Sequence, residues 1–241
     1  MEKNKYVVGN MKMMMNSSDL VGYLKKVNSS IISDHVILCP TSIYTPYFLK
    51  QYYKVGLQNV YFDSGAYTGE VSPFQAKSLG ISCTLVGHSD RRINFKETDT
   101  VVNKKILTSL DAGLSVILCV GETLEEHELL KTDRVLKKQI TYALRYVKDL
   151  SRIMIAYEPV WAIGTKKFPK PDSIEASIRY IKDIIEKEYD YTDMKVLYGG
   201  SVDAKNIKSI ASVPNLDGVL VGSASCNADE FLKIIEVVLG E

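Results

Sequence analysis

Short runs of apolar, often β-branched residues recur along the whole chain, and most are continuous rather than alternating with polar residues. Such runs are typical of strands in a parallel sheet, because helices cover both faces of the sheet. The pattern predicts eight strands, at residues 5–9, 35–39, 58–62, 83–86, 115–120, 152–157, 194–198 and 216–221.

The segments between these runs carry apolar residues three or four positions apart, which is the spacing of one face of a helix. Ile174, Ile178, Ile181 and Ile185 form a clear series of this kind. The spacing predicts helices over residues 20–27, 100–112, 132–150, 174–189 and 231–239.

Strand and helix thus alternate eight times, and no Pro/Gly/Ser-rich linker or low-complexity tract divides the chain. This alternation favours an α/β fold in which residues 1–241 form a single domain, a closed parallel (β/α)8 barrel. A doubly wound open sheet also alternates strands and helices, so it is the competing architecture.

The charges nearly cancel, since 30 Lys and Arg face 29 Asp and Glu and leave a net charge of +1. Binding to nucleic acid or to a membrane surface needs a basic excess, so neither partner is expected. No run approaches the roughly 18 apolar residues of a membrane span, and the charged N-terminus lacks a signal-peptide core. Cys39, Cys83, Cys119 and Cys226 are too far apart to suggest a metal site or disulfides, so we expect buried thiols and a cytoplasmic protein.

The chemistry of a (β/α)8 barrel lies on the loops that follow its strands. Lys12 follows the first predicted strand, His88 the fourth and Glu158 the sixth. A neutral imidazole at His88 could donate a hydrogen bond to a reacting oxygen, and burial would make Glu158 a stronger base. Of the other histidines, His35 begins a strand and His127 lies in an acidic amphipathic stretch, so neither is a candidate.

Two glycine-bearing loops, Gly199-Gly200-Ser201 and Gly222-Ser223, follow the last two predicted strands. Loops at these positions of a barrel commonly bind phosphate, because glycine lets backbone N–H groups approach an anion. The residues after Glu158 are unusually apolar for a surface loop and suit a lid that excludes water. Each signal is weak alone, but together they place a lysine, a histidine, a carboxylate, a lid and a phosphate cradle at one barrel end.

With these residues in view, the sequence resembles the triosephosphate isomerase family over essentially its whole length. The resemblance is carried by short stretches, most of them at strand ends. They are GNMKM at 9–13, YTGEVSP at 67–73, VGHS at 86–89, CVGE at 119–122, AYEPVWAIGT at 156–165, YGGSV at 198–202 and VG at 221–222. The stretch around Glu158 is very specific, and it occurs together with the His88 motif.

The resemblance implies a TIM barrel that interconverts dihydroxyacetone phosphate and D-glyceraldehyde 3-phosphate, in glycolysis and gluconeogenesis, without a cofactor or metal. It implies that Glu158 is the base, that a neutral His88 serves the enediolate oxygens, and that Lys12 supplies positive charge. The implied lid runs from Pro159 to Lys166. The implied substrate contacts are Asn10, Lys12, Gly164, Ser201, Gly222 and Ser223.

Supporting residues are implied as well. Cys119 is expected to pack beneath Glu158, Glu122 to support the loop after the fifth strand, and Arg92 to form an ion pair with Glu97.

The resemblance further implies a homodimer. The loop that runs from Asp63 to Pro73, with Thr68 at its tip, would enter a pocket beside the active site of the partner subunit. The methionine run at residues 13–15, beside Lys12, suits a soft apolar interface.

The chain departs from the family pattern at several positions. Asp90 replaces a glutamate and reaches less far toward Lys12. Ser223 replaces a glycine in the cradle and adds a Cβ where unusual backbone torsions are expected. Pro169 lacks the N–H that the Tyr198 hydroxyl is expected to bond, so we expect a less tightly latched closed lid.

Two other functions are open at this stage. Another phosphate-handling (β/α)8 isomerase would share the cradle, although none is known to us with the Glu158 lid and the His88 motif together. A non-catalytic descendant that binds surfaces would not need Asn10, Lys12, His88 and Glu158 intact.

Overall fold

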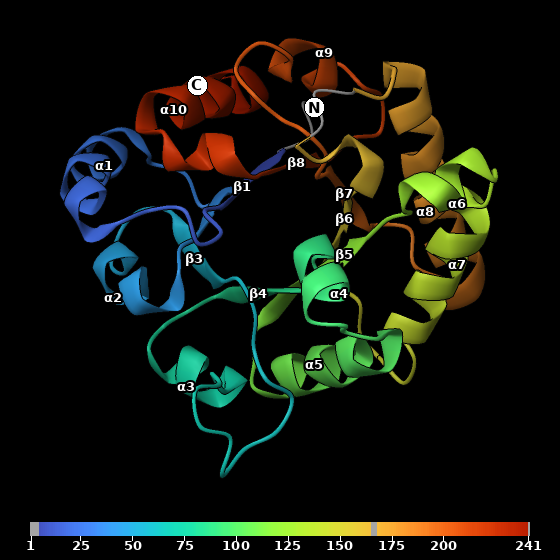
Figure 1. Ribbon diagram of the computed structural model, residues 1–241, viewed down its shortest axis with the longest axis horizontal. Coiled ribbons are helices and arrows are strands. Elements are labelled where there is room, and N and C mark those ends of the chain that lie inside the picture. The colour runs from blue at the N-terminus through green and yellow to red at the C-terminus, as the bar shows by residue number, and fades with distance from the viewer. Residues whose placement is uncertain (1–4, 165–167, 241) are drawn as a thin grey trace.

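The computed structural model describes residues 5–164 and 168–240. Eight parallel strands follow one another around a ring in chain order, and β8 pairs with β1 to close it (Figure 1). The predicted closed (β/α)8 barrel is therefore confirmed, and the open sheet is excluded because it would leave two edge strands unpaired. The strands are β1 (Tyr6–Asn10), β2 (Val36–Cys39), β3 (Lys54–Leu57), β4 (Cys83–Val86), β5 (Ser115–Val120), β6 (Ile153–Tyr157), β7 (Lys195–Tyr198) and β8 (Gly218–Val221).

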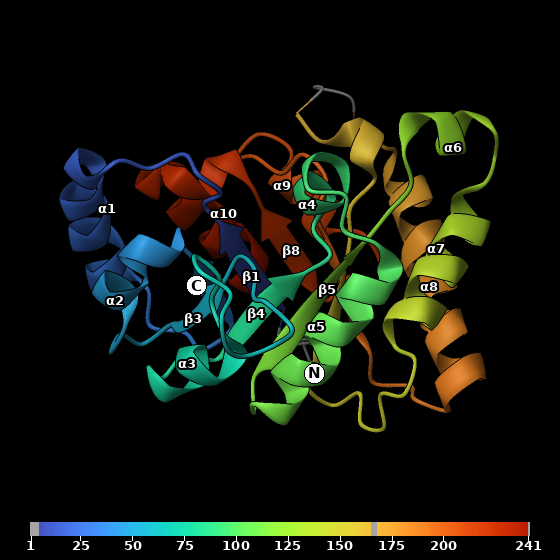
Figure 2. The same ribbon diagram turned by 60° about the horizontal axis from the view of Figure 1, so that its bottom comes forward.

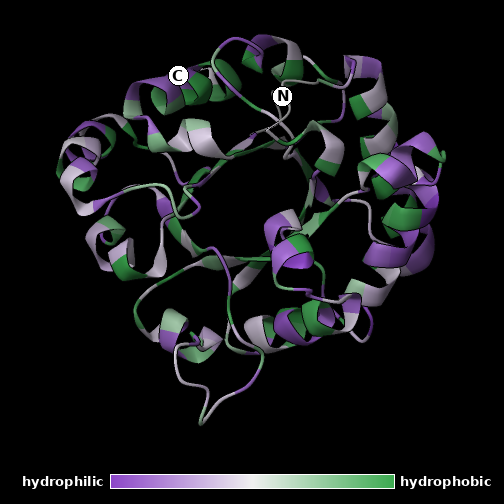
Figure 3. Cartoon of the chain, in the orientation of Figure 1, coloured by the Kyte–Doolittle hydropathy of each residue, from purple (hydrophilic) through white to green (hydrophobic). Residues whose placement is uncertain are grey.

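Helices surround the ring and turn their apolar sides toward it (Figure 3). In α8 the predicted isoleucine series is buried, which shows how the helical spacing directs one face to the core. The helix predicted for residues 132–150 ends at Ala143, and Tyr146 beyond it takes a left-handed φ of 66°. The helices are α1 (Ser17–Ser30), α2 (Thr45–Phe48), α3 (Pro73–Ser78), α4 (Ser89–Asn94), α5 (Asp99–Asp111), α6 (Leu124–Glu128), α7 (Thr132–Ala143), α8 (Pro171–Tyr189), α9 (Ile207–Ala211) and α10 (Ala228–Leu239), with 3₁₀ turns η1 (Ser42–Tyr44), η2 (Val160–Ala162) and η3 (Ser223–Cys226).

The strand predicted at residues 58–62 is wrong, because the third strand of the barrel is β3, four residues earlier. Gly56 lies in the middle of β3, and glycine weakens the strand signal of a sequence. A Cβ at Gly56 would lie 2.8 Å from the sulfur atoms of both Cys39 and Cys83, so the crowded barrel interior requires a glycine here. Val60 packs instead in a small cluster with Ile81 and others, outside the ring interior.

The ring interior is a packed core rather than a channel. A larger apolar cluster lies between the strands and the surrounding helices. The interior cluster consists of Val8, Ile37, Cys39, Cys83, Leu85, Ile117, Cys119, Ala156, Leu197 and Leu220. All four cysteines are free thiols. Because the interior is filled, a site must lie at one end of the barrel.

The carboxyl ends of the strands lie at one end of the barrel, where the loops that follow them gather. Figure 2 shows α4, α6 and the segment around η2 together on this side. Within residues 5–164 and 168–240, no helix combines the length and hydrophobicity that crossing a membrane requires.

Candidate active site

Lys12 follows β1 and adopts a left-handed φ of 49°, which residues other than glycine seldom do. Its backbone N–H donates a hydrogen bond to Asn10 Oδ1 over 3.0 Å. Its carbonyl accepts hydrogen bonds from Thr41 Oγ1 (3.0 Å) and Gln58 Nε2 (2.8 Å). Lys12 Nζ lies 3.1 Å from Asp90 Oδ2, so the shorter aspartate still reaches the lysine.

His88 follows β4 and caps the N-terminus of α4. Its Nδ1 accepts a hydrogen bond from the backbone N–H of Asp90 (3.0 Å), so the proton of the neutral imidazole resides on Nε2. Nε2 lies 3.1 Å from Glu158 Oε1, so the two predicted catalytic groups are in direct contact.

Glu158 follows β6 and is only 2% exposed. Besides contacting His88, its carboxylate accepts a hydrogen bond from the backbone N–H of Ser89 to Oε2 (3.0 Å). Two glycines make room for it, because a Cβ at Gly121 would lie 1.8 Å from the Glu158 carbonyl oxygen and one at Gly199 would lie 2.9 Å from Glu158 Cγ. The carboxylate is thus held in a dry, tightly packed position.

A pocket of about 610 Å³ lies at the ends of β7 and β8. Ser201 Oγ donates to the carbonyl of Ala162 (2.6 Å) and accepts from the N–H of Gly164 (3.2 Å), which ties the loop after β7 to the loop after β6. Ser223 begins η3 without a left-handed φ, so the unusual torsions expected at this position are not present. The predicted residues that line this pocket are Lys12, Gly164, Ser201, Gly222 and Ser223.

A second pocket, of about 590 Å³, has Asn10, His88 and Asp90 in its lining. Lys12 lines both pockets and therefore joins the His88 side of the site to the glycine-bearing loops. The structure thus brings the predicted lysine, histidine, carboxylate and loops to one end of the barrel. In the described part of the chain, no group of three or more His, Cys, Asp or Glu side chains is arranged to hold a metal ion.

Cys119 and Glu122 lie beneath this site. Burial raises the pKa of the Cys119 thiol, and the neighbouring Glu158 carboxylate adds to the rise, so Cys119 packs against Glu158 as predicted. The Glu122 carboxylate accepts hydrogen bonds from Trp161 Nε1 (2.7 Å) and the Tyr157 hydroxyl (3.2 Å). Burial raises the pKa of Glu122, and these hydrogen bonds oppose the rise. Glu122 therefore ties the loop after β5 to the turn η2.

The predicted ion pair between Arg92 and Glu97 is wrong. Arg92 Nη1 pairs with Asp99 Oδ1 at 2.6 Å, whereas the Glu97 carboxylate pairs with Arg91 and Lys105. Arg91 and Arg92 are neighbours in α4, and consecutive residues of a helix point in different directions. Sequence spacing alone did not reveal which of the two arginines faces Glu97.

Some residues of the site were not predicted at all. The sequence pattern places Gln58 in a strand and gives Thr41 no role, yet both hold the backbone of Lys12. His127 was set aside, yet its ring stacks on that of Trp161 with centroids 4.3 Å apart. These contacts join residues far apart along the chain, so no local pattern could have indicated them.

The lid predicted from Pro159 to Lys166 is described through Gly164, and residues 165–167 lie outside the described residues. Within the described part, Trp161 is bonded to Glu122 and Gly164 to Ser201. The weaker latch expected at Pro169 stays a prediction.

Comparison with known proteins gives a consistent result along the chain. A family model described as triosephosphate isomerase matches residues 5–238. The triosephosphate isomerase of Chlorobium phaeobacteroides is 39% identical over 248 residues, which cover 97% of this chain and 98% of the relative. The triosephosphate isomerase of Finegoldia magna is 38% identical, and the match covers 95% of this chain and 96% of the relative. The triosephosphate isomerase of Alkaliphilus metalliredigens is 45% identical over 188 residues, which cover 76% of each chain.

Proposed function

The chain belongs to the triosephosphate isomerase family, and we propose that it interconverts dihydroxyacetone phosphate and D-glyceraldehyde 3-phosphate without a cofactor. The reaction moves a proton between adjacent carbons through an enediolate. The observation that carries the proposal is the 3.1 Å contact between His88 Nε2 and the buried carboxylate of Glu158, at the barrel end that also carries Lys12.

Glu158 acts as the base that removes and returns the carbon-bound proton. Its carboxylate is withdrawn from bulk water and lies at the barrel end where the substrate binds, so it can take the proton from one carbon and return it to the next. In the absence of substrate the carboxylate bonds to His88 and Ser89. Substrate binding exchanges these contacts for the reacting carbons.

His88 acts as a neutral hydrogen-bond donor at the substrate oxygens. Its Nδ1 is already engaged by the N–H of Asp90, which leaves the Nε2–H to face the substrate. Lys12 Nζ and the Asn10 amide add positive charge and a donor where the enediolate develops negative charge. Preorganised groups of this kind stabilise a transition state strongly because they need not reorient during the reaction.

The substrate phosphate binds in the pocket at the ends of β7 and β8, largely through backbone N–H groups. Lys12 serves this end as well, since it lines both pockets. The lid from Pro159 to Lys166 covers the ligand and keeps water from the enediolate, which would otherwise lose its phosphate. The phosphate contacts are Gly164, Ser201, Gly222 and Ser223.

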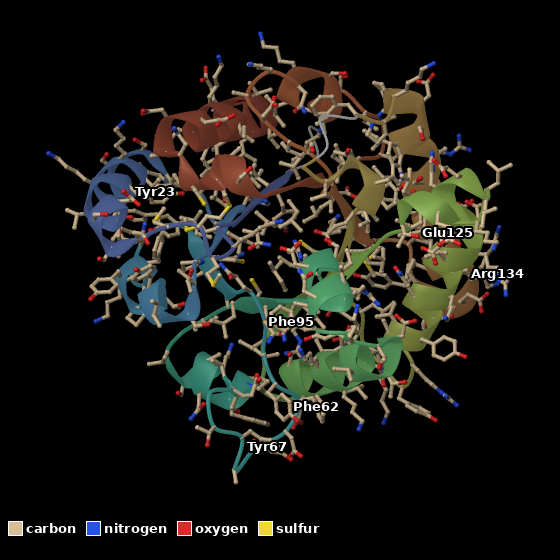
Figure 4. The ribbon with its side chains drawn as sticks, in the orientation of Figure 1. Tyr23, Phe62, Tyr67, Phe95, Glu125 and Arg134 are labelled. Atoms are coloured by element: carbon tan, nitrogen blue, oxygen red, sulfur yellow. The ribbon has the colours of Figure 1, made fainter. Side chains whose placement is uncertain are left out.

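We further infer a cytoplasmic homodimer in which residues 1–241 of each chain form one domain. The loop that contains Thr68 projects away from the barrel (Figure 1), and Tyr67 within it is labelled in Figure 4. Large apolar side chains are exposed beside the pocket of Lys12, with Met13 90% and Phe95 64% exposed. Exposed apolar surface with polar surroundings favours a protein interface. The free thiols are typical of a reducing compartment.

A coupled assay with D-glyceraldehyde 3-phosphate tests the activity and the base together. Glu158→Gln keeps the size of the side chain and removes its basicity, so we expect kcat to fall by about 10²–10⁴-fold or more. Glu186→Gln, at an exposed position of α8, is the control and should retain wild-type turnover. Turnover retained in Glu158→Gln would contradict the base assignment.

The same assay separates the competing functions. Wild-type protein without turnover would favour a non-catalytic descendant. Turnover of a different phosphorylated sugar alone would favour another barrel isomerase.

A further inference from the structure

We propose that His127 is a positioning residue that holds the first turn of the lid through Trp161, and that protonation of its imidazole strengthens this hold. The two rings are stacked, with their centroids 4.3 Å and their planes 26° apart. His127 belongs to α6, the helix marked by Glu125 in Figure 4, and Trp161 belongs to η2. The inference rests on the proposed lid, because Trp161 affects catalysis only if η2 moves with it.

A buried carboxylate completes the contact. Trp161 Nε1 donates to Glu122 Oε1 over 2.7 Å, and His127 Nδ1 lies 3.5 Å from the same oxygen. The Glu122 side chain is fully buried, whereas that of His127 is 40% exposed and open to protons from solvent. A positive charge on the imidazole is therefore attracted to the Glu122 carboxylate, and water screens this attraction only weakly.

The other charged groups around His127 are mostly acidic. Tyr157 reaches the same carboxylate from the end of β6 and donates a neutral hydrogen bond. A pocket of about 430 Å³ beside His127 brings in side chains of α7 and α8. The charged groups are Asp133 from α7, Arg179 and Asp183 from α8, and Glu125, Glu126 and Glu128 from α6 itself.

Protonation adds two attractions in the arrangement described here. The imidazolium pairs with Glu122, and it lies over the face of the Trp161 ring as a cation. Both attractions are lost if η2 moves away. Protonation should therefore shift the equilibrium between the present and the displaced position of η2 toward the present one by about two- to fivefold, the equivalent of about 0.5–1 kcal/mol. Histidine changes charge between pH 5 and 8, so the lid should be released more readily toward the upper end of that range.

Tryptophan fluorescence measures this contact directly, because Trp161 is the single tryptophan of the sequence. We expect its emission to titrate between pH 5 and 8 in the wild type, since a charged ring stacked on an indole alters its emission. His127→Phe keeps a stacked ring but cannot be protonated, so the transition should disappear. His35→Phe is the matched control and should keep the transition, because the His35 ring contacts Tyr6, with centroids 4.7 Å and planes 43° apart, and not Trp161. If His127→Phe does not fold, His127→Gln serves the same purpose.

Glu122→Gln distinguishes the two groups that could titrate. Burial raises the pKa of Glu122, so protonation of this carboxylate could itself alter the emission of Trp161. If His127 is the titrating group, the transition persists in Glu122→Gln. A transition that persists in His127→Phe and is lost in Glu122→Gln would overturn the proposal.

The pH profile of turnover tests the effect on the lid. Between pH 8 and pH 5 we expect the ratio of kcat in His127→Phe to kcat in the wild type to change about two- to fivefold, since only the wild-type lid is held more tightly. A constant ratio would refute the positioning role. The fluorescence measurement needs no substrate, so its outcome does not depend on whether the proposed isomerase activity is correct.

Discussion

At the scale of single residues, Lys12 combines an uncommon backbone conformation with a charge shared between two pockets. A left-handed φ costs a non-glycine residue roughly 1–2 kcal/mol, and it persists only where neighbours hold it. Here Thr41 and Gln58 do so through the Lys12 carbonyl. The conformation turns the chain sharply after β1 and leaves the lysine side chain lining both pockets.

Ser223 gives a prediction at this scale, because it adds a hydroxyl to a cradle that the family builds with glycine. The side chain lines the pocket together with Gly222 and Ser201, so we expect it to donate a hydrogen bond to the substrate phosphate. Ser223→Ala keeps the backbone N–H and removes the hydroxyl. KM for both triose phosphates should rise about two- to tenfold, with a smaller change in kcat.

Steady-state kinetics in both directions check this, with Ser209→Ala at an exposed position of α9 as the control. An unchanged KM in Ser223→Ala would contradict a hydrogen bond from this hydroxyl to the phosphate.

The placement of the catalytic candidates at one barrel end could be predicted from the sequence, because each lies within two residues of the end of a strand. Lys12, His88 and Glu158 end three apolar runs, and barrel chemistry lies where such runs end. Their partners could not be predicted, since Gln58 and Thr41 reach Lys12 only through the closed ring. A sequence pattern reports what a residue can do, whereas its neighbours are known only from the fold.

At the scale of elements, a buried ion cluster joins the end of α4 to α5 and to the loop after β3. Lys105 Nζ donates to Asn59 Oδ1 (2.6 Å) and to Glu97, which also pairs with Arg91. The side chains of Lys105 and Glu97 are 3% and 5% exposed. Burial lowers the pKa of Lys105, and the Glu97 carboxylate opposes the shift. The cluster fixes the helix that His88 caps.

Glu97→Gln should therefore destabilise the fold strongly. It leaves the Lys105 charge buried without its counter-charge, a change that typically costs about 3–5 kcal/mol. Urea unfolding measures the difference in the free energy of unfolding between the variant and the wild type. The exposed pair of Lys26 and Asp229 offers a control, because Asp229→Asn should cost less than about 1 kcal/mol. Equal losses in the two variants would contradict a special role for the buried cluster.

The bounds of some strands could be predicted from the sequence, whereas one strand could not. Two strands, β4 and β5, have the predicted bounds, because their residues are mostly apolar or β-branched and a glycine follows each strand. β3 was missed because Gly56 divides its run, and the need for glycine comes from Cys39 and Cys83 on the neighbouring strands. Local propensity could not indicate a requirement imposed by the closed barrel.

At the scale of the whole molecule, the net charge of +1 supplies almost no long-range attraction for a dianionic substrate. In the proposed site, this attraction comes from Lys12 and from oriented N–H groups at one barrel end. In the proposed homodimer, a second subunit would cover the exposed apolar surface near Lys12 and exclude water from the surroundings of this charge.

The loop that carries Thr68 allows this dependence on assembly to be tested. Tyr61 N–H donates to the Val71 carbonyl (2.9 Å), so the base of the loop is already closed and a short Gly-Ser connection can replace residues 65–70. We expect the shortened chain to sediment as a folded monomer with kcat/KM reduced at least about 10²-fold, since Lys12 and His88 lose the cover of the partner subunit. Leu130→Lys, a similar disturbance at a residue 92% exposed beyond α6, should remain an active dimer. A shortened chain that is still dimeric, or a monomer that keeps full activity, would show that the apolar surface beside Lys12 serves another purpose.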